Sequence, residues 1–246
     1  MSPVIIFILI LLVVLLIVYL IRYTMGNTNT LQSAVKSGQD MTTFTAKSLA
    51  SSDTPSSNFS YSIWFYVNDW NYQYGKPKVL FGRMGTASAT VDPLTGISGT
   101  DPCPLVKLGN LENSVEINLS CYSTTDSTQS TVSSCIVANI PIQRWVNLAI
   151  SVYGRTLDVY MNGKLVKTCV LPGIAKINNN SDVFLTPNKG FDGWTSKFAY
   201  FPTPINPEDA WTAYTKGPTG LMSGLSTYQV QMSLLKNGQT LNSAAF

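Results

Sequence analysis

The stretch RWVNLAISVYGRTLDVYMNGKLV, residues 144–166, decides the fold. Over residues 145–152 every second side chain is aliphatic, which is the period-two pattern of a β-strand. The alternation stops at Gly154 and returns over residues 157–161. Asn162-Gly163 follows, the pair best suited to the positive φ angles of a type I′ turn, and apolar residues then resume. The pattern predicts two successive β-hairpins.

More strands precede this stretch. Residues 58–68 (NFSYSIWFYVN) alternate strongly, and both faces become apolar toward the end, which indicates a central strand of a two-layer structure. Further strands are expected at 79–83, 105–123 (a strand pair) and 135–138, with a long loop over 86–104. Many short strands separated by turn residues, with no ordinary helix before the last fifth of the chain, predict a β-sandwich.

The chain begins with an apolar segment. Residues 4–21 are all apolar or Tyr, and about 18 residues at a rise of about 1.5 Å each approach the ~30 Å hydrocarbon thickness of a bilayer. A cleaved signal peptide is the alternative, but residues 1–3 supply no basic n-region, and the apolar run exceeds the usual ~7–15 residues. We therefore expect a retained single-pass transmembrane helix that contacts membrane lipid.

Two residues at the end of this segment, Arg22 and Tyr23, are expected at the membrane interface, where a long basic side chain reaches the headgroups. Because the N-terminal flank carries no basic residue, the positive-inside rule favours a cytoplasmic position for the rest of the chain. Residues 24–57 are rich in Thr, Ser, Asn and Gln and are expected to form a polar stalk, with room for a short helix or a first strand.

Charge and length limit the partners. The 246 residues carry a net charge of +3, and 12% of them are charged. This balance is too weak and too scattered to indicate nucleic-acid binding. The longest basic feature consists of Lys76, Lys78 and Arg83, which fit either a solvated strand edge or a phosphate site, and of these we expect the edge. One span and one β region leave room for a single sizeable core.

The cysteines leave the redox state open. The chain has Cys103, Cys121, Cys135 and Cys169. Four cysteines permit two disulfides in three pairings, and buried free thiols fit the sequence equally well. No two are spaced as C-x-x-C and the chain has no His, so a zinc site is not expected. N-glycosylation sequons begin at Asn58, Asn118 and Asn179 and matter only if the domain is lumenal.

Four segments carry a resemblance to a known family. In order they are FSYSIWFYVND (59–69), VLFGR (79–83), RWVNLAISVYGRTLDVYMNGKLV (144–166) and FDGWTSKFAYFPTPINPEDAWTAY (191–214). They resemble the laminin-G-like domains of the concanavalin A-like lectin/glucanase superfamily, in which a W-x-x-(apolar)-A strand, an L-x-(apolar)-Y-x-N-G hairpin and a closing F-x-G strand lead into a short helix. The resemblance covers about residues 59–216 and implies a concanavalin A-like jelly roll of two antiparallel sheets.

Local chemistry independently predicts the closing helix. Asn206 can cap it, and Pro207 suits its first position. Trp211 and Tyr214 share one helical face, which is expected to pack on the sandwich, and Gly217 ends the helix. Four parts are therefore expected: a transmembrane anchor (1–23), a polar stalk (24–57), a laminin-G-like sandwich (58–217) and a C-terminal tail (218–246).

The sequence does not predict an enzyme, and no catalytic residue is assigned. Glucanases of this superfamily resemble one another in an E-x-D-x-E strand, because retaining hydrolysis needs two carboxyl groups about 5 Å apart. Here Glu112 and Glu116 have no Asp between them. The absence of His removes the commonest general acid-base residue.

A binding site is expected at Trp70, Tyr72 and Tyr74, which alternate and would form an aromatic stripe on an extended edge. Such rings pack on a protein's own loops, contact a partner protein or stack on a carbohydrate. Laminin-G-like calcium sites draw on Asp and Asn side chains at the sandwich rim, so the resemblance leaves calcium open; no other cofactor is indicated. The loop candidates are Asp92, Asp101, Asp126 and Asp182.

The tail supplies the last functional signal. Tyr228, Val230, Met232 and Leu234 alternate before an Asn237-Gly238 turn, and a tail of this kind can add a strand to a neighbouring protein. The leading hypothesis is a non-enzymatic, membrane-anchored structural protein that ties a membrane to a protein shell. Anchored laminin-G-like chains of this compact kind resemble minor capsid components of large DNA viruses, in which the domain on the internal membrane of the virion would face the capsid. The alternative is a cell-surface, lectin-like adhesion module that binds carbohydrate.

Overall fold

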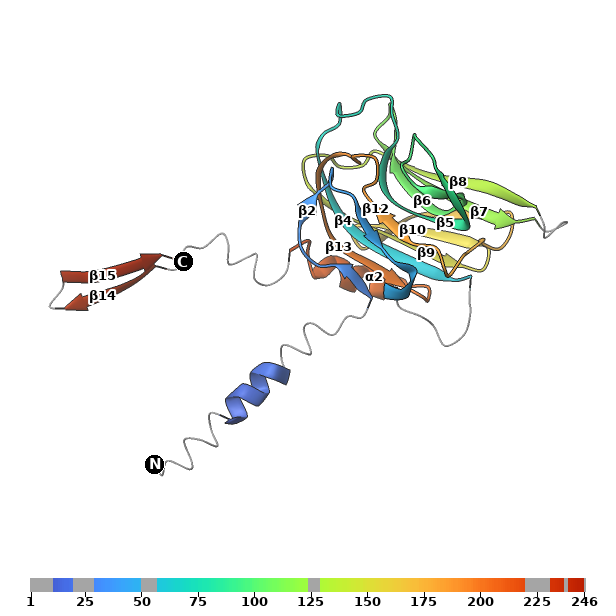
Figure 1. Ribbon diagram of the computed structural model, residues 1–246. Helices are drawn as coiled ribbons and strands as arrows, with labels where there is room; N and C mark the ends of the chain where they lie inside the picture. The colour runs from blue at the N-terminus through green and yellow to red at the C-terminus, as the bar shows by residue number, and fades with distance from the viewer. Residues whose placement is uncertain are drawn as a thin grey trace.

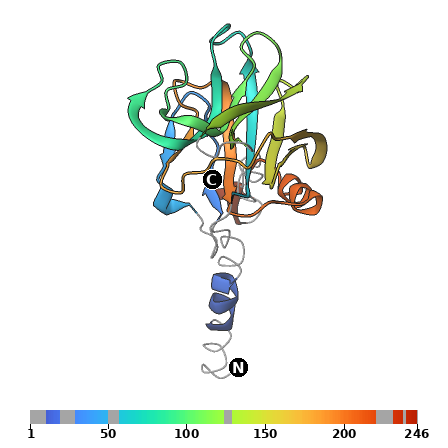
Figure 2. The same ribbon diagram turned by 90° about the vertical axis from the view of Figure 1, so that its right-hand side faces the viewer.

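The structure, a computed structural model, describes residues 11–19, 29–49, 57–123, 129–219, 231–236 and 239–245. Most of these residues form two antiparallel sheets packed face to face. Figures 1 and 2 show the two layers, with helix α2 (Pro207–Thr215) outside the sheet that contains β9 and β13. The mainly β, two-sheet sandwich that the sequence predicts is confirmed.

The first sheet has seven strands in the order β1-β13-β4-β9-β10-β11, with β2 also paired to β13. Its strands are β1 (Thr30–Gln32), β2 (Lys36–Ser37), β4 (Phe59–Asp69), β9 (Trp145–Tyr153), β10 (Thr156–Met161), β11 (Lys164–Val170) and β13 (Asp192–Phe201). The second sheet has six strands in the order β3-β12-β5-β6-β7-β8. These are β3 (Thr42–Phe44), β5 (Lys78–Val91), β6 (Ser98–Leu108), β7 (Ser114–Tyr122), β8 (Ser130–Ala138) and β12 (Val183–Leu185).

The main core lies between the sheets. Alternate residues of the long strands fill it, as a strand's period of two requires. From β4 these residues are Phe59, Tyr61, Ile63, Phe65 and Val67, and from β9 they are Val146, Leu148, Ile150 and Val152. All of them are buried, so residues on the other side of β4 and β9 are the ones that remain available on the outer face of the seven-stranded sheet.

The turn that joins β10 to β11 has the geometry of a type I′ hairpin. Asn162 has a φ of 51° and Gly163 a φ of 74°, while Met161 and Lys164 pair on either side. The Asn162 side chain also accepts a hydrogen bond from the backbone N–H of Asn147 (3.0 Å), which ties the turn to β9.

The segment expected as a stalk contributes more strands than the single first strand for which its sequence left room. β1 and β2 pair with β13, β3 pairs with β12, and a short 3-10 helix, η1 (Ala46–Ser48), follows. The polar composition of this segment concealed strands only two or three residues long, because such strands are specified by their partners rather than by an alternating pattern of their own.

The expected loop over 86–104 is a second difference. Residues to Val91 continue β5 and residues from Ser98 begin β6, so the two strands form a long hairpin. Lys78 and Arg83 also do not lie at a solvated edge, because β5 sits between β12 and β6 inside the sheet. They are 1% and 3% exposed. Lys78 Nζ donates to the Trp70 carbonyl (2.9 Å), and Arg83 Nε donates to the Ser181 carbonyl (3.1 Å).

Helix α2 begins with a reciprocal cap. The Asn206 side chain accepts from the Asp209 backbone N–H (2.9 Å), and the Asp209 carboxylate accepts from the Asn206 backbone N–H (3.0 Å). The Tyr214 ring stacks on Trp64 of β4, with centroids 5.6 Å apart, so the helix covers part of the outer face of the seven-stranded sheet.

The N-terminal apolar segment is described only over residues 11–19, which are helical and exposed. The remainder of residues 4–21, together with Arg22 and Tyr23, lies outside the described residues. Within the part of the chain that the structure describes, no helix is both long enough and apolar enough to cross a bilayer. In the C-terminal tail, β14 (Gln231–Lys236) pairs with β15 (Gln239–Ala245); Tyr228, Val230 and the Asn237-Gly238 turn lie outside the described residues.

Candidate functional site

The three aromatic residues singled out in the sequence do not form a stripe. Residues 70–75 make a turn after β4, started by the Asp69 carboxylate, which accepts from the Asn71 N–H (2.9 Å). Trp70 packs against the main core, with the Lys78 ammonium 4.4 Å from its ring. Tyr72 is half-buried and Tyr74 is 59% exposed. Only an extended strand would place alternate residues on one face.

A different set of aromatic residues is brought together by strand register. Tyr66 in β4 pairs directly with Trp194 in β13 on one side and with Trp145 in β9 on the other. Directly paired residues point to the same face of a sheet. The centroid of the Tyr66 ring lies 5.4 Å from the ring centroid of Trp194 and 5.9 Å from that of Trp145, and both pairs have edge-to-face geometry. We call Trp145, Tyr66 and Trp194 the aromatic row.

The aromatic row lies on the part of the sheet that helix α2 leaves open. Two residues earlier on β4, Trp64 is 4% exposed because Tyr214 of the helix covers it. Trp194, by contrast, is 43% exposed, and Tyr66 and Trp145 are half-buried. Partly exposed Trp and Tyr rings that touch one another have few rotamers left to lose on binding, which favours a ligand surface.

A cluster of exposed polar groups lies beside the row. The Asp192 carboxylate, two residues before Trp194, accepts from the Gln39 amide (3.2 Å) and from the Asn68 amide (2.8 Å). The Gln143 amide donates to the Asn68 carbonyl (3.5 Å). We call Gln39, Asn68 and Asp192 the polar fringe. It presents both hydrogen-bond donors and acceptors next to the ring faces.

Aromatic faces next to amide and carboxylate groups suit carbohydrates. The C–H faces of a pyranose ring stack on aromatic rings, and its hydroxyls both donate and accept hydrogen bonds. No spacing within the sequence indicates this row, because its three members come from strands more than 40 residues apart. Only the pairing order β13-β4-β9 unites them.

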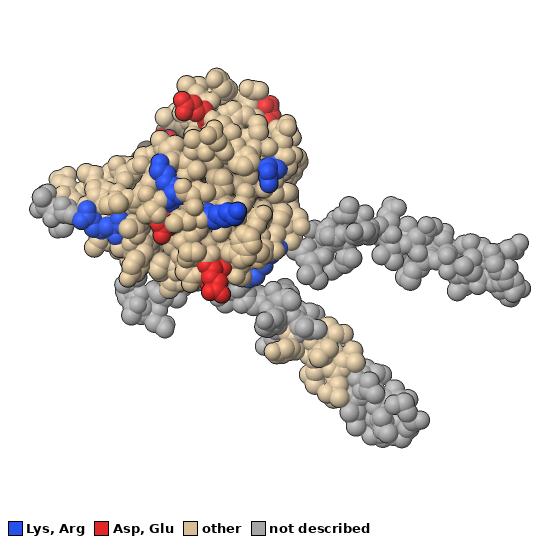
Figure 3. All heavy atoms as spheres, turned by 180° about the vertical axis from the view of Figure 1, so that it is seen from behind, with Lys and Arg blue, Asp and Glu red and all other residues tan. Residues whose placement is uncertain are grey.

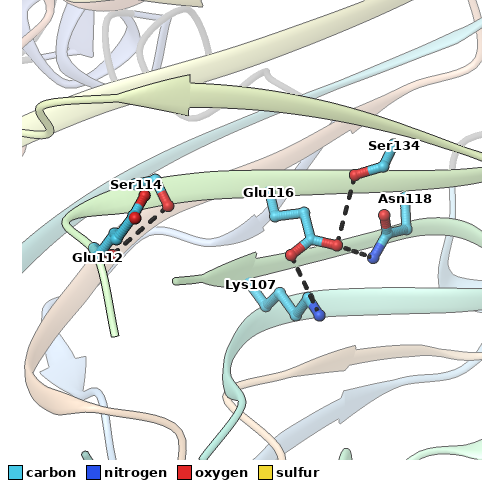
Figure 4. Close-up of polar contacts among 6 residues, drawn as sticks. All are labelled: Lys107, Glu112, Ser114, Glu116, Asn118 and Ser134. Carbon is cyan, nitrogen blue, oxygen red and sulfur yellow. Dashed lines mark hydrogen bonds and ion pairs between the residues drawn. The ribbon is translucent and has the colours of Figure 1, made fainter. Parts of the chain in front are cut away.

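The two glutamates do not form a hydrolytic pair. Glu116 on β7 binds Lys107 (3.2 Å) and accepts from the Asn118 amide (2.9 Å) and the Ser134 hydroxyl (3.4 Å). Figure 4 shows this network, with Glu112 outside it at the turn before β7. Glu116 therefore has an ammonium partner rather than a second carboxyl group, and retaining hydrolysis needs the latter.

The aspartates proposed for calcium are used separately by protein donors. Asp92 accepts from the Leu94 N–H (3.0 Å) and the Thr95 hydroxyl (2.8 Å), and the Leu94 bond chiefly lowers its pKa. Asp101 binds Lys176 (2.7 Å), and Asp182 accepts from the Ala46 N–H (2.9 Å). Asp126 lies outside the described residues. Among the residues that are described, no three His, Cys, Asp or Glu side chains form a group that could hold a metal ion.

The cysteines resolve into one bonded and two free residues. Cys135 and Cys169 form a disulfide, whereas Cys103 and Cys121 are buried thiols. Burial raises the pKa of both thiols, which keeps them protonated and unreactive at neutral pH. Of the three sequon asparagines, Asn118 is buried against Glu116, Asn58 is half-buried and Asn179 is exposed.

Charged residues do not form a dense basic patch on the face shown in Figure 3, where acidic and basic side chains are interspersed. This agrees with the low net charge and gives no basis for a phosphate-binding surface there.

Comparison with known proteins extends the geometric description. Residues 36–209, more than half of the chain, match the sequence profile of the concanavalin A-like lectin/glucanases superfamily, in its Laminin_G_3 group. No curated protein matches the chain significantly.

Among the solved structures with a similar fold are neurotoxin domains. The botulinum neurotoxin serotype D binding domain superimposes with a TM-score of 0.52 at 13% identity, covering 75% of this chain and 41% of that domain. The serotype D ligand-binding domain in complex with N-acetylneuraminic acid gives 0.51 at 13% identity, covering 77% and 50%. The chain therefore spans half or less of these domains, and the likeness concerns the fold.

Proposed function

Because the chain belongs to the concanavalin A-like lectin/glucanase superfamily, we propose that it is a non-catalytic, lectin-like module that binds carbohydrate on the aromatic row. One observation carries the proposal: Trp145, Tyr66 and Trp194 stand in direct register across three strands, partly exposed, beside the polar fringe. The fold supplies a rigid platform, and the ring contacts fix the orientation of each face.

The dimensions fit a short linear glycan. Neighbouring strands lie about 4.8 Å apart, so three side chains in register extend over about 10 Å, roughly two pyranose units. Stacking on the rings would supply most of the affinity, because it removes apolar surface from water. The polar fringe would select among sugars, since the Asp192 carboxylate only accepts hydrogen bonds whereas the Asn68 and Gln39 amides also donate them.

The test measures binding of the full chain, in detergent, to an array of glycans. Trp194→Ala should reduce binding of the best glycan at least tenfold. Trp211→Ala is the matched control, because Trp211 is 48% exposed but lies on α2, away from the row. Equal losses in the two variants, or no glycan retained by the unaltered protein, would contradict the proposal.

The proposal excludes hydrolysis at Glu116. Glu116 is ion-paired with Lys107 and is the one carboxylate on β7, so this strand holds no acid-base pair. Incubation with the bound glycan should yield no shorter product, and Glu116→Gln should leave binding unchanged. Release of reducing ends that disappears in Glu116→Gln would show the domain to be an enzyme.

We further propose that residues 4–21 hold the domain at a membrane, with the aromatic row directed away from it. Thr30 of β1 is level with Ala199, which pairs with Ser62 of β4. Tyr66 lies four residues further along β4, which corresponds to about 13 Å. The described chain thus enters the sandwich at the end of β4 opposite to the polar fringe.

The disulfide supports one side of the membrane for the domain. Disulfides persist in oxidising compartments and are rare in the cytosol, so the Cys135–Cys169 bond supports an exoplasmic domain. A lectin that binds cell-surface glycans would need the same side. The lone Arg22 supports the opposite orientation, but a single charge is a weak determinant.

A link between a membrane and a protein shell is the second candidate. It is supported by exposed apolar residues on the edge strands of the two sheets, which are Val132, Ile136, Leu165, Val166 and Val170. Exposed apolar side chains on edge strands favour contacts with other proteins. Crosslinking of the native membrane should then yield adducts that are lost in Val166→Lys and kept in Trp194→Ala. Loss in neither variant would contradict this second candidate.

A further inference from the structure

A groove opens where three loops meet at the far end of the sandwich. The loops are 70–77 between β4 and β5, 92–97 between β5 and β6, and 186–191 between β12 and β13. The groove has a volume of about 530 Å³ and is lined by Tyr72, Gln73, Lys76, Pro77, Pro93, Leu94, Asn188 and Lys189. Building on the proposed function, we propose that this loop groove binds the anionic group of an acidic sugar whose remaining units lie on the aromatic row.

The charges of the groove fit an anion. Lys76 and Lys189 are both exposed on its walls, and no Asp or Glu is among the described residues that line it. The acidic residues closest along the chain hydrogen-bond within their own turns. The Asp69 carboxylate accepts from the Asn71 N–H, and the Asp92 carboxylate accepts from the Leu94 N–H and the Thr95 hydroxyl. Two ammonium groups facing one hollow repel each other, so an anion between them relieves the repulsion as well as pairing with each.

The groove also has a surface for the ring that carries the anion. Tyr72 is half-buried, with Pro77, Pro93 and Leu94 beside it, so the hollow combines an aromatic face and apolar walls with its two cations. Free phosphate could use the ammonium groups but not this apolar surface. A sugar with a carboxylate or sulfate uses both, which is why the lining favours an acidic sugar.

Hydrogen bonds lock the three loops together before any ligand arrives. The Gln73 amide donates to the Asn188 carbonyl (3.1 Å), and the Asn188 amide donates to the carbonyls of Leu94 (2.9 Å) and Pro93 (3.3 Å). Gln73, Asn188 and Lys189 also hold φ values of 52°, 51° and 62°, in the left-handed region that non-glycine residues seldom adopt. Backbone strain of this kind persists only where the surroundings enforce it, and it concentrates at functional sites.

The groove and the aromatic row lie toward the same end of the β4–β13 pair. Asp69, the last residue of β4, pairs with Asp192, the first residue of β13. Tyr72 follows Asp69 by three residues and Lys189 precedes Asp192 by three residues, and both line the groove. Tyr66 precedes Asp69 by three residues, or about 10 Å. A glycan on the row can therefore extend over the polar fringe and place its terminal unit in the groove.

The test compares two sugars that differ by one acidic unit. Binding of 3′-sialyllactose and of lactose to the full chain in detergent is measured by calorimetry. We expect the acidic sugar to bind about tenfold more tightly, and the preference to shrink as NaCl rises from 50 to 500 mM, because exposed charges are screened. 3′-Sulfolactose should also bind more tightly than lactose if the negative charge contributes more to affinity than the sugar unit that carries it.

Two double variants locate the effect. Lys76→Gln/Lys189→Gln should abolish the preference and leave lactose binding unchanged. Lys47→Gln/Lys164→Gln removes two exposed cations elsewhere and should keep the preference. Thermal unfolding of each variant verifies that it is folded.

The outcomes separate the groove from the proposed function. If lactose binding depends on Trp194 but the acidic sugar is not preferred, the groove does not bind the anionic group, and the proposed function still holds. A preference for the acidic sugar that survives Lys76→Gln/Lys189→Gln would also contradict the proposal that the groove binds the anionic group. If neither sugar nor any arrayed glycan binds, both proposals fail.

Discussion

Cys135 in β8 and Cys169 in β11 form a disulfide that joins the last strand of one sheet to the last strand of the other. The Lys167 ammonium makes a second link between these strands by donating to the Ile136 carbonyl (2.7 Å). Edge strands offer unpaired backbone groups to other chains, and the two links hold this pair of edges together. The disulfide thus closes one side of the sandwich.

Removing this disulfide should lower the stability of the domain. Its cysteines are 34 residues apart in sequence, and a closed loop of that length is worth about 3–4 kcal/mol through the entropy of the unfolded chain. Cys135→Ser/Cys169→Ser should therefore unfold at a clearly lower denaturant concentration. An unchanged unfolding midpoint would show that the bond does not constrain the unfolded chain.

The free cysteines provide the control for that measurement. Cys103→Ala should cost only what the loss of a buried side chain costs, and the variant should keep one disulfide. A thiol reagent should label neither Cys103 nor Cys121 until the protein is unfolded, after which it should label two residues without reduction.

Local patterns in the sequence were sufficient for the hairpin and the closing helix. The Asn162-Gly163 turn and the Asn206 cap each depend on residues within a few positions of one another. The disulfide and the aromatic row could not be found in this way. Cys135 meets Cys169, and Tyr66 meets Trp194, only because of the order in which distant strands pair, which no short-range periodicity encodes.

The aromatic residues after β4 illustrate the opposite error. Trp70, Tyr72 and Tyr74 alternate as strand residues do, but the Asp69 carboxylate caps the Asn71 N–H and starts a turn. The alternation in the sequence therefore predicted an extended geometry that these residues do not have. Tyr72 still lines the loop groove, whereas Trp70 belongs to the core.

Gly163 should be harder to replace than Gly154. Both have positive φ, 74° and 57°, so alanine is strained at either position by about 1 kcal/mol or more. A Cβ on Gly163 would also approach Trp211 Cε3 to 2.9 Å and Tyr214 Cβ to 3.0 Å, whereas nothing lies within 4 Å at Gly154. We expect Gly163→Ala to cost about 2–4 kcal/mol and Gly154→Ala about half as much. Equal unfolding midpoints would show that α2 does not press on the turn.

Asp101 should stabilise the domain at neutral pH and lose this effect in acid. The hydrogen bond from Lys176 chiefly holds its pKa below the usual value, with Thr86 and Ser130 also donating to it. A carboxyl group with a lowered pKa adds stability above its unfolded pKa of about 4, and this contribution disappears as the pH falls through the lower, folded pKa.

Asp101→Asn should therefore cost about 1–2 kcal/mol at pH 7, and the cost should shrink below about pH 4. Asn tolerates the φ of 60° at this position, so the backbone is not the cause. Denaturant unfolding at pH 7 and pH 3 measures both values. Asp40→Asn, at an exposed position, serves as the control, and a cost independent of pH would contradict the assignment.

Membrane attachment and orientation can be measured together. Detergent, but not carbonate or high salt, should release the full chain, because burial of about 18 apolar residues does not depend on ionic strength. On the exoplasmic side Asn179, the exposed sequon, should carry a glycan, so glycosidase treatment should shift the band and Asn179→Gln should abolish the shift. Release by salt alone would refute the anchor, and an unshifted band would favour the cytoplasmic orientation.

Trp64 and Trp194 lie on the same outer face of the seven-stranded sheet. Truncation of Trp64 should mainly lower the stability of the domain, whereas truncation of Trp194 should mainly lower glycan binding. Trp64 is 4% exposed beneath Tyr214, so Trp64→Ala should leave a cavity under α2 and cost about 3–5 kcal/mol. Trp194 is 43% exposed and loses mainly its edge-to-face contact with Tyr66, which is worth about 1 kcal/mol. Chemical unfolding measures the first effect, and glycan binding measures the second. If Trp194→Ala destabilises the domain as strongly as Trp64→Ala, the aromatic row is part of the core, and the exposed rings do not form a ligand surface.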